Sequence, residues 1–268
     1  MSIFPRRVPR AEMAISEREL SQMTRELDEL HESTFPQVSA VLDEMAVNLG
    51  RVVRAPSSRR GFFAGAAGAV ALGAVAACSG GSSGAPSPSS SAVPPTPEET
   101  YVGDLKVVAL AAALENLAVT AYAGALKKAG AGQLGTVPPA VATFVQTAMK
   151  QHADHAQAWN AVLSKAGKPT VDGAPLTITN DQVSMLTAAN SVPEVAKLAL
   201  NLENVAAQTY TFAAANVSDA GGIMTAATIQ PVETMHAAIL NFILGQYPVP
   251  ESFIGIANSL KPDMLTAK

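Results

Sequence analysis

Cysteine is almost absent from this 268-residue sequence, which holds a single one, Cys78. One cysteine excludes an intrachain disulfide and any metal site built from several thiolates. Aromatic residues make up 5% and charged residues 15% of the chain, against 48% hydrophobic residues. Few aromatics and abundant alanine favour close-packed helices over a sandwich or barrel. The composition therefore predicts an all-α protein.

Excess positive charge is also lacking. The net charge is −4 at pH 7, and no basic stripe occurs past residue 100. A nucleic-acid partner is therefore not expected. Glutamate and histidine are scarce in the same region, where the only glutamates are at positions 115, 194, 203, 233 and 251 and the only histidines at 152, 155 and 236.

Most of these scarce residues belong to a duplicated pattern. Residues 114–122 read LENLAVTAY and residues 202–210 read LENVAAQTY, so each copy has a tyrosine seven residues after its glutamate. One predicted helix later come the histidine motifs HADH, at 152–155, and ETMH, at 233–236. Two duplicated helix pairs, each with a Glu and then a His motif, are typical of a four-helix bundle around a metal site.

The surroundings of the two repeated glutamates support this interpretation. Glu115 follows the wholly apolar residues 107–114, and Glu203 follows the nearly apolar residues 195–200. A carboxylate on a buried face costs several kcal/mol or more unless it is paired or binds a metal. Both glutamates are therefore candidate ligands.

Turn and capping residues delimit the predicted helices. We expect helices at about residues 105–129, 139–166, 191–216 and from Gly222 to 245, with a crossover at 168–190 that holds a helical turn at 181–189. Ser191 is a candidate N-cap. Pro231 predicts either a kink in the last helix or a break between two short helices, and the apolar stripe from Ile229 to Phe242 favours the kink.

The paired Glu…Tyr segments and Glu233-x-x-His236 resemble the ferritin-like superfamily of di-iron carboxylate proteins, the rubrerythrin-type members especially, over about residues 101–246. The resemblance implies a ferritin-like four-helix bundle of two helix hairpins joined by the long crossover. It also implies the metal ligands Glu115, His155, Glu203, Glu233 and His236, with Tyr122 and Tyr210 hydrogen-bonding ligands across the core.

One position departs from that pattern. His152 stands three residues before His155, where the family has a glutamate that commonly bridges two metals. As residues i and i+3 share a helix face, His152 is a candidate metal ligand, with an outer or solvent-facing role as the alternative. Three carboxylates leave about one positive charge uncompensated beside two divalent ions, so a dinuclear and a mononuclear site are both open.

The region before the domain resembles an export signal. Residues 58–63, SRRGFF, resemble the twin-arginine signal, and the apolar run 64–77 ends in VAAC, which resembles the lipobox of bacterial lipoproteins. The resemblance implies lipidation of Cys78 and an extracytoplasmic protein anchored to the bacterial cell membrane. The alternative is a short transmembrane anchor with an incidental cysteine. Residues 79–100 are expected to be a flexible Ser/Gly/Pro tether.

The segment 1–57 before the signal carries an apolar stripe at helical spacing and predicts a helical extension. Cleavage before Cys78 would remove it. A true start at Met45 and a genuine cytoplasmic extension are the two alternatives. At the other end, residues 247–268 are expected to form a tail packed on the bundle.

The resemblance implies iron or manganese as cofactor and oxidoreductase chemistry with oxygen or peroxide, of the di-iron oxidase or peroxidase type. Rubrerythrin-like peroxidases carry a four-cysteine iron domain as electron relay, so this chain would need an external electron donor. The alternative is a non-enzymatic envelope lipoprotein with a structural or degenerate metal site. Metal delivery or sensing would use the same residues.

Overall fold

The computed structural model describes residues 16–54, 100–251 and 253–266. Its elements are α1 (Glu17–Arg54), α4 (Asp104–Gly130), α5 (Pro139–Lys165), α6 (Thr179–Ala188), α7 (Val192–Asn216), α8 (Ala220–Ile243) and the 3-10 helix η1 (Pro262–Met264). Across these described ranges there is no β-strand, only the isolated bridge between Leu176 and Leu265. The predicted all-α class is confirmed.

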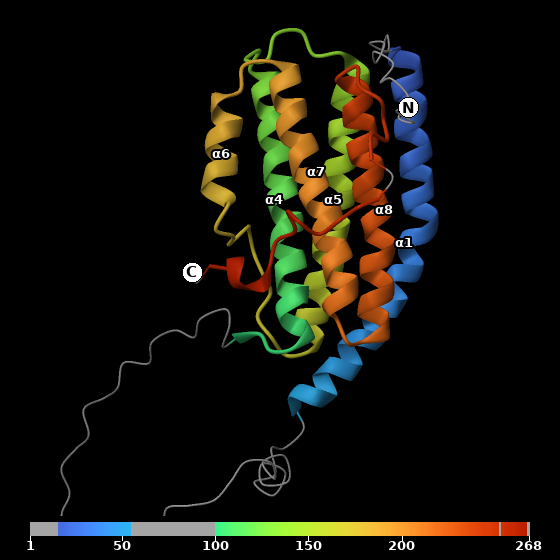
Figure 1. Ribbon diagram of the computed structural model, residues 1–268, viewed down its shortest axis with the longest axis vertical. Coiled ribbons are helices and arrows are strands. Elements are labelled where there is room, and N and C mark those ends of the chain that lie inside the picture. The colour runs from blue at the N-terminus through green and yellow to red at the C-terminus, as the bar shows by residue number, and fades with distance from the viewer. Residues whose placement is uncertain (1–15, 55–99, 252, 267–268) are drawn as a thin grey trace, which may run out of the picture.

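Four long helices form the bundle, in two hairpins (Figure 1). Helix α4 packs against α5, α7 packs against α8, and α4 meets α7 across the bundle. Helix α6 belongs to the long connection between the hairpins and lies on α4 and α7. This is the predicted ferritin-like arrangement. Helix α8 continues through Pro231, so the alternative of a break between two short helices is wrong.

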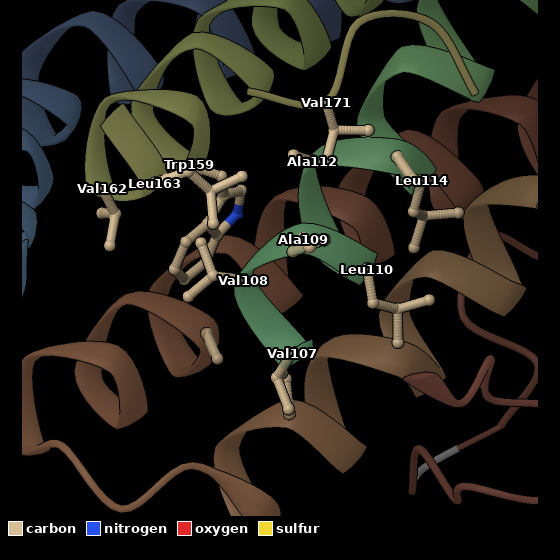
Figure 2. Packing of buried hydrophobic residues seen from close by; sticks show 14 of the residues in the cluster. Val107, Val108, Ala109, Leu110, Ala112, Leu114, Trp159, Val162, Leu163 and Val171 are labelled. Carbon is tan, nitrogen blue, oxygen red and sulfur yellow. The ribbon is translucent and has the colours of Figure 1, made fainter. Parts of the chain in front are cut away.

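The core explains why α4 is so apolar. Figure 2 shows Val108 and Leu110 of α4 in one buried cluster with Trp159 and Leu163 of α5. By length and composition α4 could cross a membrane, but 67% of its most apolar stretch is buried inside the bundle. Burial in the protein core accounts for the apolar sequence that precedes Glu115.

Side-chain caps set the starts of the two helices of the second hairpin. Ser191 Oγ accepts a hydrogen bond from the Glu194 backbone N–H at 3.4 Å, as its N-cap position suggested. Asp219 Oδ1 accepts from the N–H groups of Gly221 and Gly222. These caps fix where α7 and α8 begin.

The N-terminal extension lies against the bundle. Helix α1 runs along α5 and α8, which touch each other little, and it closes the face between them (Figure 1). Its buried side chains recur every three or four residues and include Leu20, Leu27, Leu42 and Met45. Removal of this segment stays a prediction. The signal at 58–78, with Cys78, and most of the tether lie outside the described residues.

The C-terminal tail contacts α7 through Leu260, whose backbone N–H donates to Thr209 Oγ1 at 2.9 Å. Leu260 is buried, whereas Phe253 is 91% exposed. Lys261 Nζ also lies 3.7 Å from the ring centre of Phe212. The tail therefore packs through its later residues.

Candidate metal centre

Six ligand-type side chains converge in the middle of the bundle, each at most 1% exposed. They are Glu115 of α4, His152 and His155 of α5, Glu203 of α7, and Glu233 and His236 of α8. These are the residues that the sequence indicated, and the structure brings all of them together. Their role as metal ligands stays a prediction.

The six residues form two overlapping groups whose ligand atoms lie within 4.8 Å of one another. Glu115 and His155 belong to one group, Glu203 and His236 belong to the other, and His152 and Glu233 belong to both. Each group thus has one glutamate and one histidine of its own. This division matches a pair of neighbouring metal positions.

Glu233 lies between the two groups and has one oxygen directed to each. Its Oε1 is 3.4 Å from His155 Nδ1, and its Oε2 is 3.5 Å from His236 Nδ1. Neither carboxylate oxygen has a hydrogen-bond partner among the described residues, and neither has His155 Nδ1. Nitrogens of His152, His155 and His236 within 3.8 Å offset part of the cost of burying this charge, and each oxygen is also placed to take a metal ion. Glu233 is therefore the candidate bridging carboxylate.

His152 lies inside the cluster rather than facing solvent. Its Nδ1 is 2.7 Å from Glu115 Oε2, and its Nε2 is 3.2 Å from Glu203 Oε1. The imidazole therefore joins the two single glutamates of the repeats. In the structure it occupies the place between them, with a nitrogen toward each group.

The two tyrosines cross between the repeats. Tyr122 donates its hydroxyl hydrogen to Glu203 Oε1, and Tyr210 donates to Glu115 Oε1. The Tyr210 hydroxyl also accepts a hydrogen bond from Trp159 Nε1 at 2.9 Å. Each tyrosine thus orients the glutamate of the other repeat, as the resemblance implied.

Opposite charges outweigh burial in setting the protonation of the cluster. Burial alone would lower the pKa of His155, but Glu115 and Glu233 raise it to about 9. The pKa of His152 is likewise raised well above its usual range against the effect of burial, by Glu233 first among the carboxylates. Burial would raise the pKa of Glu115, but His155 and His152 hold it at about 2. Without metal, these histidines are protonated at neutral pH, so a metal ion must displace protons to bind.

The donor set fits a divalent transition metal. Three carboxylates and three imidazoles suit iron, manganese or zinc better than calcium or magnesium, which prefer oxygen ligands. Glu233 Oε1, Glu233 Oε2 and His155 Nδ1 are buried and have no hydrogen-bond partner among the described residues, so they are available to hold a metal. The residues present therefore fit the implied metal.

Sequence reasoning gave no role to three residues outside the cluster, of which two contact its histidines and the third contacts one of those two. Gln151 Oε1 lies 2.9 Å from His236 Nε2, His31 Nε2 lies 3.3 Å from His155 Nε2, and Asp28 lies beside Gln151. His31 follows Leu27 by four residues, so its place on the apolar stripe of the N-terminal helix was a signal that could have been read. Asp28 shows no such signal.

A protein-family model described as a ferritin-like domain matches residues 103–246, which include the six clustered residues. No curated protein and no solved structure gives a significant match to the chain.

Proposed function

The chain belongs to the ferritin-like domain family, and on that premise we propose that it binds iron or manganese and performs redox chemistry with oxygen or peroxide. The observation that carries the proposal is Glu233, whose two buried oxygens have no hydrogen-bond partner among the described residues and each face one group of donors. Such carboxylate bridges are built from facing helices in ferritin-like bundles.

Bound iron or manganese would supply electron exchange with oxygen or peroxide. The chain holds the six donors, keeps bulk water from them and orients two carboxylates through Tyr122 and Tyr210. Orientation by a fixed hydroxyl reduces the freedom of each carboxylate to turn away from an ion.

The cavities beside the cluster favour small, uncharged reactants. Two cavities lined almost entirely by apolar side chains border Tyr122, and one of them also borders Glu203. Ala125 and Ala199 line both. Apolar walls admit oxygen or neutral peroxide more readily than a charged substrate.

A structural role is the second candidate, and His152 favours it. Its two nitrogens pair with Glu115 and Glu203, so the metal-free cluster already balances part of its own charge. A bundle with such a network can hold together without catalysis. Metal binding without oxygen reactivity would support this alternative.

We also propose that the protein is exported by the twin-arginine route and anchored through lipid on Cys78. The support is the order of residues 58–78: paired arginines, an apolar run, then Val-Ala-Ala-Cys. Labelling of cells with a radioactive fatty acid tests the anchor, because Cys78→Ser should abolish incorporation and release the protein from membranes. Incorporation that persists in Cys78→Ser would overturn it.

The redox proposal is tested on full-length protein, with Glu203→Ala as control. Iron and manganese per chain are counted by plasma mass spectrometry, and the ferrous-loaded protein is then mixed with oxygen or hydrogen peroxide. The proposal requires bound metal, lost or reduced in the variant, and oxidation faster than that of free ferrous ion in the same buffer. Bound metal without faster oxidation supports the structural role, and no metal in folded protein overturns the redox proposal and leaves the structural role.

A further inference from the structure

Helix α1 carries two polar side chains that face the ligand cluster. Asp28 and His31 are three residues apart, so they lie on one face of the helix, and both contact α5. His31 is 3% exposed and lies in a buried stripe that is otherwise mainly apolar. Its ring stacks on Phe35 with 4.8 Å between centroids.

His31 contacts the outer nitrogen of His155. The two Nε2 atoms are 3.3 Å apart, while His155 Nδ1 faces Glu115 Oε1 at 3.5 Å and Glu233 Oε1 at 3.4 Å. When a metal binds His155 Nδ1, the one remaining imidazole proton lies on Nε2, so His155 donates at Nε2 and His31 accepts at its own Nε2.

Asp28 acts on His236, a histidine of the other donor group, through Gln151. Gln151 Nε2 donates to Asp28 Oδ1 at 3.3 Å, which turns Gln151 Oε1 toward His236 Nε2 at 2.9 Å. A carboxylate only accepts hydrogen bonds, and an amide oxygen does the same. His236 must therefore carry a proton on Nε2, so Nδ1, which lies 3.3 Å from Glu203 Oε2 and 3.5 Å from Glu233 Oε2, is the nitrogen that can give up its proton to a metal.

We propose that α1 supports the metal centre. His31 positions His155, and Asp28 positions His236 through Gln151. The inference rests on the proposed metal binding. His155 and His236 then both present Nδ1 to the metal. Helix α1 holds the Nε2 atoms of both, directly for His155 and through Gln151 for His236. Outer partners of this kind fix the tautomer and orientation of ligand histidines.

The His31 side chain is not explained by packing alone. Its Nδ1 is buried with no hydrogen-bond partner among the described residues. A phenylalanine would fill a similar space beside Phe35 and remove this unsatisfied Nδ1, but it would also take the partner from His155 Nε2. Because these two effects oppose each other, His31→Phe should change the stability of the metal-free fold little, while it weakens metal binding.

The experiment uses Zn²⁺ as a diamagnetic probe on the full chain labelled with ¹⁵N-histidine. Five proteins are compared: wild type, His31→Phe, His31→Gln, Asp28→Leu and Leu27→Ala. The last is the control, since Leu27 is buried on the same stripe and has no polar link to the cluster. Zn²⁺ affinity is measured by chelator competition, imidazole tautomers by ¹⁵N NMR, and metal-free stability by thermal unfolding.

We expect His31→Phe and Asp28→Leu each to lower Zn²⁺ affinity by about 10- to 100-fold. His31→Phe should change the ¹⁵N signals of His155, Asp28→Leu those of His236, and His31→Gln should restore affinity because its amide oxygen accepts. Leu27→Ala should lower the unfolding temperature and spare the affinity.

Unchanged affinity in both polar variants would overturn the inference, as would an equal loss of affinity in Leu27→Ala or an Nδ1–H tautomer in the Zn²⁺-loaded wild type. A folded wild-type protein that binds no Zn²⁺ would overturn the proposed metal binding itself, which is a separate result.

Discussion

Replacing Glu233 by glutamine should remove more metal than replacing either single glutamate. Glu233 directs one oxygen to each donor group, 3.4 Å from His155 Nδ1 and 3.5 Å from His236 Nδ1. Glutamine has one acceptor oxygen and an amide NH₂ that would face the other group. Glu115 and Glu203 each belong to only one group. We therefore expect two ions per chain in the wild type, one in Glu115→Gln or Glu203→Gln, and fewer than one in Glu233→Gln.

The difference should appear in thermal stability. At free metal about 100-fold above the dissociation constant, each site contributes about 2.7 kcal/mol. Two sites would contribute about 5 kcal/mol, or a rise in Tm of about 10–20 °C for a domain of this size, and one site about half of that. Metal should barely raise the Tm of Glu233→Gln.

The assay is anaerobic loading with ferrous iron, metal counting after desalting, and calorimetric unfolding with and without metal. The metal-free proteins serve as controls, because the same metal-free Tm in all four would show that the substitutions leave the fold intact. The reasoning fails if Glu233→Gln binds two ions, or if Glu203→Gln loses both while Glu233→Gln keeps one.

Three further predictions follow from the same geometry. The metal-free protein should lose up to about 3 kcal/mol as pH rises from 6.5 through 9, because the pKa of His155 is about 9 folded and about 6.5 unfolded. Urea unfolding between pH 6 and 10 measures the free energy of unfolding, and a value that does not change with pH would contradict the prediction. Zn²⁺ affinity should rise over the same pH interval. Tyr210→Phe should cost about 1–3 kcal/mol, more than Tyr122→Phe, since it also leaves Trp159 N–H without its acceptor; equal urea midpoints would count against this. Ala199 lines both apolar cavities, so Ala199→Phe should narrow this shared wall and slow ferrous oxidation without changing metal content, and an unchanged stopped-flow rate would count against access through these cavities.

The packing of α1 bears on export. Cleavage before Cys78, which stays a prediction, would separate His31 and Asp28 from the bundle and expose the face of α5 and α8 that α1 covers. The exported form would then hold a less supported metal centre than the full chain. Zn²⁺ affinity of the chain from residue 79 onward, compared with that of the full chain, measures the difference: about 10-fold or more weaker binding is expected, and equal affinity would contradict it.

Several features of this protein were readable in the sequence because they depend on neighbouring residues. Ser191 and Pro193 mark the start of α7 through local backbone chemistry, whereas the glycines at 221 and 222, expected to separate α7 from α8, lie in the first turn of α8. The spacing of Glu233 and His236 places both on one helix face, whatever surrounds that helix. The repeat of Leu-Glu-Asn in an apolar setting indicated two buried carboxylates, since buried charge is costly enough to be rare.

Only the tertiary structure decided which groups meet across the bundle. The packing of the four helices brings Tyr122 to the glutamate of the other repeat, and it places Glu233 between two sets of donors with no hydrogen-bond partner among the residues that the structure describes. The docking of α1, which brings His31 to His155 from 124 residues away, depends on it too. An apolar stripe predicts that one face of a helix will be buried against another element, but it does not indicate which element, because the hydrophobic effect is not directional. Shape and hydrogen-bond geometry select the partner, and they exist only once the helices are packed together.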